Sequence, residues 1–466
     1  MRRKTAGYPV GSRCTNAMKK GQREMARSRH MAQPAKPHTR DAINRISMPA
    51  LTLLLVALFW LMLIAVYCIP TDFMKDNLIE SEQILKTENL YPASYTTGKS
   101  YDNFTVAIML DEAALGNENP IKDSVEARYY YDDDVISTVA HSVNGEWNTS
   151  YSRYWHGYLV FLKPLLLLFD VRGIRLLLQT TMLVLLGLAS IAFYRRWGNR
   201  GILFAVALLL SMGLFGVADA SATLPIFSSF AIATLGCIVL VRHVEWTDYE
   251  LRRAFFVIGA VTVYFDFLDN PIITLGLSLL TVVLLRYRSS SAQDLVKTIL
   301  QGILFWGLGY GILWGAKWIL AAIVLGPSAF VDAISQLLFR TGMKNVDGIP
   351  ETSAASAITK NLNAIGVLAP IILVLAIVLV VGITVMAIKS KREQRTHVIA
   401  FGCGIILIAA LPFAWYCGAS NHSDIHAVLL TYRNLIVTLD ALLIGLFEIG
   451  ALMHDRKVQL QKSQDC

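Results

Sequence analysis

The sequence MPALTLLLVALFWLMLIAVYCI, from Met48 to Ile69, decides the class of fold. It contains no charged residue, and it is long enough for a helix, which rises about 1.5 Å per residue, to cross about 30 Å of hydrocarbon. Other apolar runs approach the same length, and the whole chain is 55% hydrophobic but only 16% charged. Ordinary soluble domains carry more charge. We therefore predict an all-α fold, a polytopic membrane bundle.

The tail before this segment, residues 1–47, carries the positive charge of the chain. It holds twelve Lys and Arg against two acids, a net charge of +10, whereas the whole chain has +8. Because Lys and Arg concentrate on the cytoplasmic flanks of membrane spans, the tail predicts a cytoplasmic N-terminus and gives no sign of nucleic-acid binding. It lacks apolar periodicity, so we expect a disordered tail near anionic lipid. Residues 48–69 lack a small-residue cleavage site, which favours an uncleaved anchor.

The next segment, residues 70–171, has the opposite charge bias. From Pro70 to Arg153 it contains fifteen Asp or Glu against six Lys or Arg, which predicts a large extracytoplasmic loop. Its last part, Tyr158 to Phe169, is apolar but short, and it carries Lys163 and Pro164. We interpret this part as an interfacial helix, because another span would also place every later basic cluster outside.

Nine more apolar segments complete a predicted bundle of about ten transmembrane helices. They lie near 174–194, 202–218, 224–241, 254–267, 272–285, 296–325, 365–388, 398–417 and 429–453. The bundle therefore comprises residues 172–325 and 364–453, separated by a second extracytoplasmic loop at 326–363. Residues 454–466 form a cytoplasmic tail. We predict a protein of the cell membrane with both termini on the cytoplasmic side. The basic clusters between spans then all face the cytoplasm.

Acidic residues gather on the predicted outer side. The candidates are Asp72, Asp102, Asp111, Asp266 and Asp269. Acids at the rim of a membrane are costly unless they face water or a partner, so they are candidates for function. Two structural alternatives remain open. Asp266 could belong to a helix-end turn broken by Asn270-Pro271, and Asp72 could cap a helix.

Histidines and aromatic residues lie on the same predicted side. Tyr154, Trp155 and His156 fit either an aromatic belt at the lipid headgroups or the lining of a site. His422 and His426 are spaced i, i+4, which one helical turn would align. The sequence fixes no third ligand at a helical spacing, so hydrogen bonding or proton transfer is favoured over metal binding, and we predict no metal site.

Basic residues on the outer side point to an anion. Arg433 lies one turn into the last span, where it either snorkels to the interface or holds an anionic group. Together with Arg340 and Lys344 from the second outer loop it could clamp a phosphate.

The order of these segments resembles that of the GT-C superfamily, membrane glycosyltransferases that take sugars from polyprenyl-phosphate carriers. The shared features are a first span, a long acidic outer loop, a surface helix and many further spans. The resemblance implies that an acid in the first outer loop is the general base and that basic residues hold the carrier phosphate. The matching acid is Asp72 in Ile69-Pro-Thr-Asp-Phe-Met-Lys-Asp76, with Asp102 and Asp111 as second choices.

The resemblance thus implies a lipid-linked sugar donor and a glycan acceptor in cell-envelope synthesis. Two other functions fit the sequence. A transporter or flippase would use intramembrane acids such as Asp266 to relay ions, and a non-catalytic partner in envelope biogenesis would keep the bundle without needing Asp72. The sequence contains no cofactor motif.

Overall fold

The structure is a computed structural model that describes residues 46–93, 101–116, 118–243, 245–344 and 352–464. It divides into two units, one ending at Leu51 and the other beginning at Thr52. Most of the predicted disordered tail lies outside the described residues. The fold that follows is that of the second unit. It confirms the all-α prediction, since the strands among the described residues are two short antiparallel ones, β1 (Arg128–Tyr129) and β2 (Thr149–Ser150).

A helix occupies each of the ten predicted apolar segments. These helices are α3 (Met48–Tyr67), α9 (Val171–Trp197), α10 (Asn199–Leu214), α12 (Leu224–Arg242), α13 (Asp248–Phe265), α14 (Pro271–Arg286), α15 (Ala292–Leu325), α18 (Leu368–Lys389), α19 (Arg392–Gly418) and α21 (Leu435–Gln464). Among the described residues, six stretches are helical, long and apolar enough to cross a membrane: α3, α9, α15, α18, most of α19, and Thr431–Val458. The others are shorter or less apolar.

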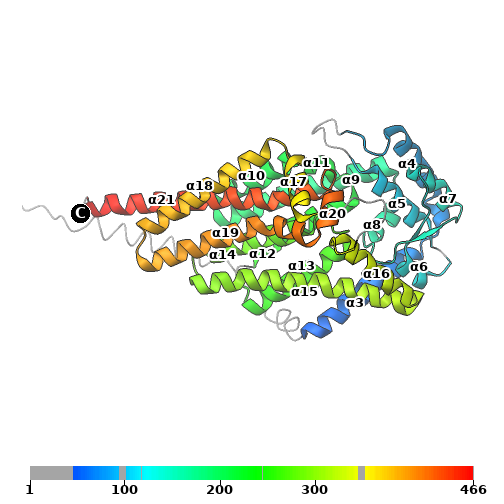
Figure 1. Cartoon of the computed structure of the whole chain (residues 1–466), viewed down its shortest axis with the longest axis horizontal. Coiled ribbons are helices and arrows are strands. Elements are labelled where there is room, and N and C mark those ends of the chain that lie inside the picture. The colour runs from blue at the N-terminus through cyan, green and yellow to red at the C-terminus, as the bar shows by residue number, and fades with distance from the viewer. Residues whose placement is uncertain (1–45, 94–100, 117, 244, 345–351, 465–466) are drawn as a thin grey trace, which may run out of the picture. The chain divides into compact units, whose positions relative to one another are not determined.

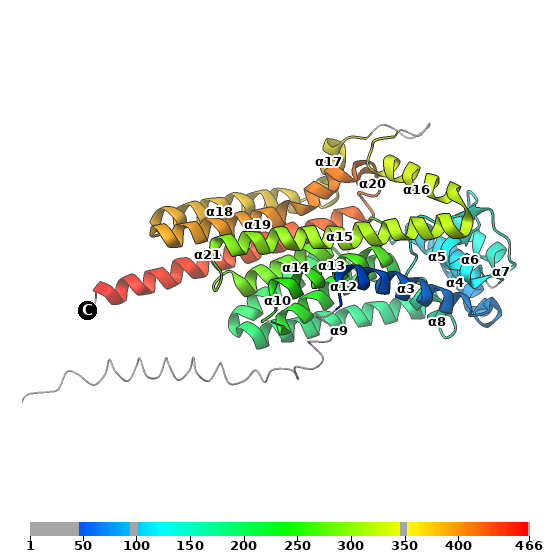
Figure 2. The same cartoon turned by 90° about the horizontal axis from the view of Figure 1, so that it is seen from below.

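Shorter elements connect these helices. They are η1 (Thr71–Phe73), α4 (Lys75–Glu88), α5 (Asn103–Ala114), α6 (Pro120–Glu126), η2 (Val135–Thr138), α7 (Val139–Val143), α8 (Leu159–Leu166), α11 (Val217–Ala220), α16 (Pro327–Arg340), α17 (Ala354–Ala364), α20 (Ser420–Ile425) and η3 (Thr431–Asn434). Figure 1 shows α4, α5, α6 and α7 grouped together beyond one end of the long helices. In Figure 2, α17 lies against α20, near the end of α16.

The long helices expose apolar faces that water would not tolerate. In α18 the most apolar stretch has a mean hydropathy of 3.3, and only 22% of it is buried. Ile371, Leu373 and Val374 all lie on its exposed surface. Because soluble monomers rarely expose contiguous apolar patches of this kind, the exposed faces indicate a protein embedded in lipid.

Helices α13 and α15 pack closely because glycines face the neighbouring backbone. A Cβ atom at Gly259 would lie 2.1 Å from the carbonyl oxygen of Trp306, and one at Gly309 would lie 2.0 Å from that of Phe256. Small residues at helix crossings let two backbones approach, which is common in membrane bundles. This contact fixes the position of α15 along α13, and with it the positions of the aromatic side chains of α15.

The predicted interfacial helix differs from expectation in the position of its lysine. The helix is present as α8, but Lys163 is fully buried, and its Nζ donates to the carbonyl oxygen of Ala113 at 2.7 Å. Its ammonium also lies 5.2 Å from the ring centroid of Tyr67. The sequence interpretation used Lys163, Pro164 and the shortness of the segment as signs that the helix lies at the interface. The α5 carbonyl satisfies Lys163 inside the protein.

Candidate functional site

The connection between α13 and α14 forms the floor of the candidate site, and Asp266 organises it. The Asp266 carboxylate accepts the backbone N–H of Leu268 at 2.7 Å and that of Asn270 at 3.0 Å. Leu268 has a φ of 73°, so this turn holds a leucine in the left-handed region. Ser229 and Tyr310 add hydroxyl hydrogen bonds at 3.2 and 3.3 Å. Asp266 is thus built into the turn, in agreement with its structural alternative.

Asp269 turns in the other direction, towards the short helix α20. Its Oδ1 lies 3.3 Å from Nε2 of His422, and both side chains are buried. The Asp269 backbone carbonyl accepts a hydrogen bond from Nδ2 of Asn434 at 3.0 Å, which fixes this turn to η3. Burial raises the pKa of Asp269 well above its ordinary value, and the charges of Asp266 and Asp102 raise it further.

His422 is held between this acid and an arginine from α16. Nη1 of Arg340 lies 3.2 Å from Nδ1 of His422 and 3.4 Å from Nε2 of His426. A guanidinium only donates, so Nδ1 accepts, and a neutral His422 ring carries its proton on Nε2, which faces Asp269. Burial lowers the pKa of His422 well below its ordinary value, and His426 and Arg340 lower it further. His422 is therefore neutral near pH 7.

We name the side chains of Arg340, His422, His426 and Asp269 the Arg340 cluster. Arg340 and His426 are only partly buried, whereas His422 is 2% exposed and Asp269 is 3% exposed. The cluster thus extends from two partly exposed side chains, Arg340 and His426, to the enclosed acid Asp269. Burial lowers the pKa of His426 to about 4, so this histidine is neutral near pH 7. The positive charge on the partly exposed side of the cluster therefore comes from Arg340.

Arg433 and Asp102 lie close to the inner part of the Arg340 cluster. Arg433 is 2% exposed, and its Nη1 donates to the carbonyl oxygen of Leu429. Asp102 caps α5 by accepting from the backbone N–H of Thr105 at 3.0 Å. Burial raises the pKa of Asp102, while the hydrogen bonds from Thr105 and the charge of Arg433 lower it. The charges of Asp102 and Arg433 also act on Asp269.

Several buried polar atoms in this region have no hydrogen-bond partner among the described residues. They are Nε of Arg340, Nε of Arg433, Oδ1 of Asn434, and both Oδ1 and Nδ2 of Asn270. Buried polar groups in proteins are almost always paired with protein, water or ligand. Nε2 of His422 likewise has no described hydrogen-bond partner, so this region has donors and acceptors available to a bound molecule; Oε1 of Glu112 and Oδ1 of Asp111, in another part of the described chain, are unpaired as well.

Helix α17 braces the α20 side of the site. Asp424 accepts hydrogen bonds from Lys360 and Ser356 of α17. Asn361 donates to the carbonyl oxygen of Ser423 at 2.9 Å, and its own Oδ1 accepts from Thr431 at 2.8 Å. These bonds hold α20 in place, and with it the predicted pair His422 and His426.

A second polar group consists of Glu112, His156 and Tyr158. Oε2 of Glu112 lies 2.8 Å from Nδ1 of His156 and accepts the hydroxyl of Tyr158. Nε2 of His156 is 2.7 Å from the carbonyl oxygen of Tyr151, which can only accept, so Nε2 carries a proton. The Glu112–His156 contact therefore shares one further proton. We name Glu112, His156 and Tyr158 the Glu112 cluster.

Sequence reasoning did not single out Glu112 as a site residue. Its signal was the pair Asp111-Glu112 at the end of an apolar run, next to Ala113-Ala114. Asp111 itself is buried, accepts from Thr138 at 2.6 Å, and has its pKa raised to about 8, chiefly by burial. Lys317 of α15 is also buried and donates to the carbonyl oxygen of Val125 at 2.8 Å.

The two neighbours of His156 in the predicted aromatic group have separate environments. Tyr154 stacks on Trp314, with ring centroids 5.9 Å apart, and its ring meets Phe267 edge-on at 5.2 Å. Burial raises its pKa to about 12, and the charges of Arg340 and Asp269 also act on it, so Tyr154 borders the Arg340 cluster. Trp155 packs against Phe59 and donates to the carbonyl oxygen of Leu313 at 2.8 Å. Trp155 is therefore a core residue.

Two further predicted site residues, Asp72 and Lys344, are exposed and belong to neither cluster. Asp72 is exposed in η1. Lys344 is exposed, and its Nζ donates to the hydroxyl of Ser335 at 2.6 Å. The structure therefore brings together Arg340, His422, His426, Asp269 and, close by, Asp102, Arg433 and Tyr154, whereas Asp111 and His156 belong to the second region.

Searches for metal sites and for similar proteins returned no match. No group of three or more His, Cys, Asp or Glu in the described part of the chain could hold a metal ion. No protein family, curated protein or solved structure matches the chain.

Proposed function

We propose that this protein is a membrane glycosyltransferase that moves a sugar from a polyprenyl-phosphate donor to a glycan acceptor at the outer face of the membrane. The observation that carries the proposal is the convergence of an arginine, two histidines and a carboxylate from α16, α20 and the α13–α14 turn. The same region holds unpaired polar atoms and the buried Arg433. Its mixture of cationic and basic groups suits the transfer of a group away from a phosphate.

The topology that serves this function has ten spans, both termini in the cytoplasm, and residues 70–171 and 326–363 outside. Six apolar helices support the membrane location, and the shorter apolar helices α10, α12 and α14, together with the less apolar α13, complete the proposed count. The Arg340 cluster then lies at the outer ends of the spans, because Asp269 follows α13, while His422 and His426 follow α19.

Arg340 would bind the donor phosphate. It is the partly exposed cation of the cluster, and a guanidinium pairs with phosphate oxygens through two parallel hydrogen bonds. When Arg340 turns towards the phosphate, it leaves Nδ1 of His422 without its donor. The same movement therefore creates an available base next to the bound sugar. Arg433 contributes a second positive charge from a fixed, buried position beside Asp102.

The chemical step then follows from these roles. The acceptor hydroxyl gives its proton to Nδ1 of His422 while its oxygen forms a bond to the anomeric carbon of the sugar. The bond from that carbon to the phosphate oxygen breaks, and the polyprenyl phosphate leaves with the electron pair, which Arg340 stabilises. The Nε2 proton of His422 passes to the Asp269 carboxylate, whose Oδ1 lies 3.3 Å away. Because Asp72 is exposed in η1 and belongs to neither cluster, we assign the base to His422 and Asp269, with Asp102 in support of Arg433.

The test compares His422→Gln with Lys344→Ala, a matched control that removes an exposed group whose described partner is Ser335. Both variants are purified, checked for folding, and assayed for transfer from polyprenyl-phosphate sugars in liposomes. We expect His422→Gln to lose roughly a hundred- to ten-thousand-fold in rate and Lys344→Ala to match the parent. Equal activity of the parent and His422→Gln would remove the proposed base.

A transporter is the second candidate function. It is supported by the decrease in side-chain exposure from the partly exposed Arg340 and His426 to the buried Asp269. Carboxylates with raised pKa values inside membrane proteins can carry protons. The same liposomes separate the two functions, because a transporter moves solute in response to a pH gradient without consuming a lipid-linked sugar. Proton-coupled uptake with no glycosyl transfer would replace the enzyme proposal.

A further inference from the structure

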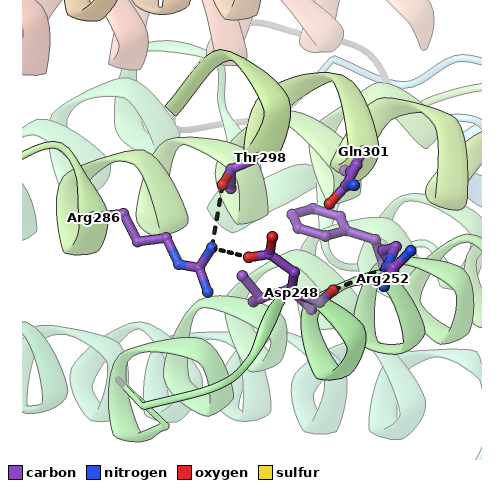
Figure 3. A pocket seen from close by; sticks show the side chains of 8 residues that line it. Asp248, Arg252, Arg286, Thr298 and Gln301 are labelled. Carbon is purple, nitrogen blue, oxygen red and sulfur yellow. Dashed lines mark hydrogen bonds and ion pairs between the residues drawn. The ribbon is translucent and has the colours of Figure 1, made fainter. Parts of the chain in front are cut away.

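A pocket lies at the arginine-rich end of the bundle, between the start of α13, the end of α14 and the first turns of α15. Figure 3 shows the side chains of Asp248, Arg252, Arg286, Thr298 and Gln301 around it. Leu251 and Phe255 add apolar surface to its lining. The pocket is separate from both polar clusters, which lie where α13 ends and α14 begins.

One arginine of the pocket is fixed by the protein itself. Nη1 of Arg286 donates to Oδ1 of Asp248 at 2.7 Å and to the hydroxyl of Thr298 at 3.2 Å, and its Nη2 donates to the carbonyl oxygen of Trp246 at 2.6 Å. Asp248 also accepts from Lys297 at 3.1 Å. The acid in the pocket is thus already paired with two cations, so it adds little repulsion towards an anion.

The second arginine has hydrogen-bonding capacity left. Nε of Arg252 donates to the backbone carbonyl of Asp248 at 3.2 Å, and its guanidinium carbon lies 5.7 Å from the ring centroid of Phe305. Its two terminal nitrogens bond to no described residue. Arg252, Arg286 and Lys297 together outweigh the charge of Asp248, so this part of the pocket has an excess of positive charge. The Gln301 amide supplies a neutral polar group on the opposite helix.

We propose that a phosphate group, carried by an anionic membrane lipid or free in solution, binds over the opening of this pocket, whose interior is filled by its own side chains. Arg252 donates two parallel hydrogen bonds to the phosphate oxygens, Gln301 adds a third, and the fixed Arg286 contributes its charge. A lipid fits because Leu300 and Leu304 of α15, close in sequence to Gln301, expose apolar side chains. The site is independent of the proposed glycosyl transfer, since it lies at the other end of α13.

The test measures binding to the full-length protein in detergent by native mass spectrometry. The probes are phosphatidylglycerol, phosphatidylcholine and inorganic phosphate. Arg252→Ala and Gln301→Leu remove the proposed contacts, while Arg242→Ala is the control, because Arg242 is an exposed arginine at the end of α12 that does not line the pocket. Retention time on size exclusion and melting temperature show that each variant folds.

We expect the parent to prefer phosphatidylglycerol over phosphatidylcholine, and Arg252→Ala to weaken that binding roughly tenfold, since a charge-assisted pair is lost. Gln301→Leu should weaken it less, and Arg242→Ala should leave it unchanged. Preference for the anionic lipid supports a lipid headgroup, whereas binding of inorganic phosphate alone, sensitive to Arg252, supports a free anion in the same site. An equal loss in Arg252→Ala and Arg242→Ala would show non-specific surface charge, and a folded Arg252→Ala with parental binding would remove the site.

Discussion

The Arg340 cluster and the Glu112 cluster each place a histidine beside a carboxylate, but they differ in burial and in the presence of a cation. Each has a histidine within 3.3 Å of a carboxylate. In the Glu112 cluster both ring nitrogens of His156 have partners, and the histidine and the acid have side-chain exposures of 1% and 0%. In the Arg340 cluster the outer residues are partly exposed, and several nearby polar atoms lack partners.

The Glu112 cluster is suited to a structural role, whereas the Arg340 cluster is suited to binding a ligand. A fully buried pair such as Glu112 and His156 holds its neighbours in one arrangement, although Oε1 of Glu112 has no described partner, and loss of one member leaves an uncompensated buried charge. A cluster with spare donors and a solvent-facing arginine can exchange its internal partner for a ligand. We therefore expect substitutions in the Arg340 cluster to affect function more than stability and those in the Glu112 cluster to do the reverse.

The largest expected effect concerns Arg340. Arg340→Ala removes the proposed phosphate contact and also the donor that occupies His422 in the absence of donor lipid. We expect kcat/KM for the lipid-linked sugar to fall roughly a hundredfold or more, with a higher KM, because a charge-assisted contact present before and during the transition state is lost. Steady-state kinetics in liposomes measure this change. Arg340→Lys should recover part of it, and an unchanged KM in Arg340→Ala would contradict phosphate binding.

The Glu112 cluster should show the reverse behaviour. Glu112→Gln breaks a buried pair with His156, so we expect a loss of about 3–5 kcal/mol in the free energy of unfolding. Asp72→Asn is the control, because Asp72 is an exposed acid of the same segment, and its loss should stay within about 0.5 kcal/mol. Denaturant unfolding in detergent micelles measures both. In the double variant with His156→Gln the two losses should not add, since one interaction is removed.

Helix α15 touches both regions, so its packing tests whether they share a support. Tyr310 reaches Asp266 beside the Arg340 cluster, and Lys317 lies near Glu112. Gly309→Ala would place a Cβ 2.0 Å from the carbonyl oxygen of Phe256. We expect a loss of about 1–3 kcal/mol from forced separation of α13 and α15. Gly311→Ala is the matched control, because a Cβ there meets nothing within 4 Å. Equal stability of the two variants would show that the crossing adapts.

The smallest expected effect is a pH dependence of stability from the partly exposed side of the Arg340 cluster. The folded pKa of His426 is about 4, below its ordinary value of 6.5. The unfolded chain therefore binds more protons in this interval, so stability is complete above about pH 6.5 and falls as the pH drops towards 4. His426→Gln should flatten the pH dependence of the melting temperature in that window. A parent and variant with parallel curves would show that His426 does not titrate as inferred.

The sequence predicted those features that depend on local composition. Apolar runs identified ten helices, and the rarity of charge beside apolar runs identified Arg340, Asp269, His422 and Arg433 before their contacts were known. The Glu112–Tyr158 contact joins residues 46 positions apart in the chain, so no helical or strand spacing could reveal it. The burial of Lys163 and Lys317 could not be predicted for the same reason, because backbone carbonyls from other elements satisfy these two lysines.

Helix α15 also sets a length scale. Its 34 residues extend about 51 Å, some 20 Å more than the hydrocarbon of a bilayer. Near its C-terminal end, Trp314 and Trp318 both donate to the carbonyl oxygen of Arg153, at 2.9 and 3.0 Å. In the proposed topology, α15 holds this part of the 70–171 segment at a fixed height above the lipid. The proposed transfer would then reach its acceptor at that height, and removal of one helical turn from α15 would lower it by about 5.4 Å.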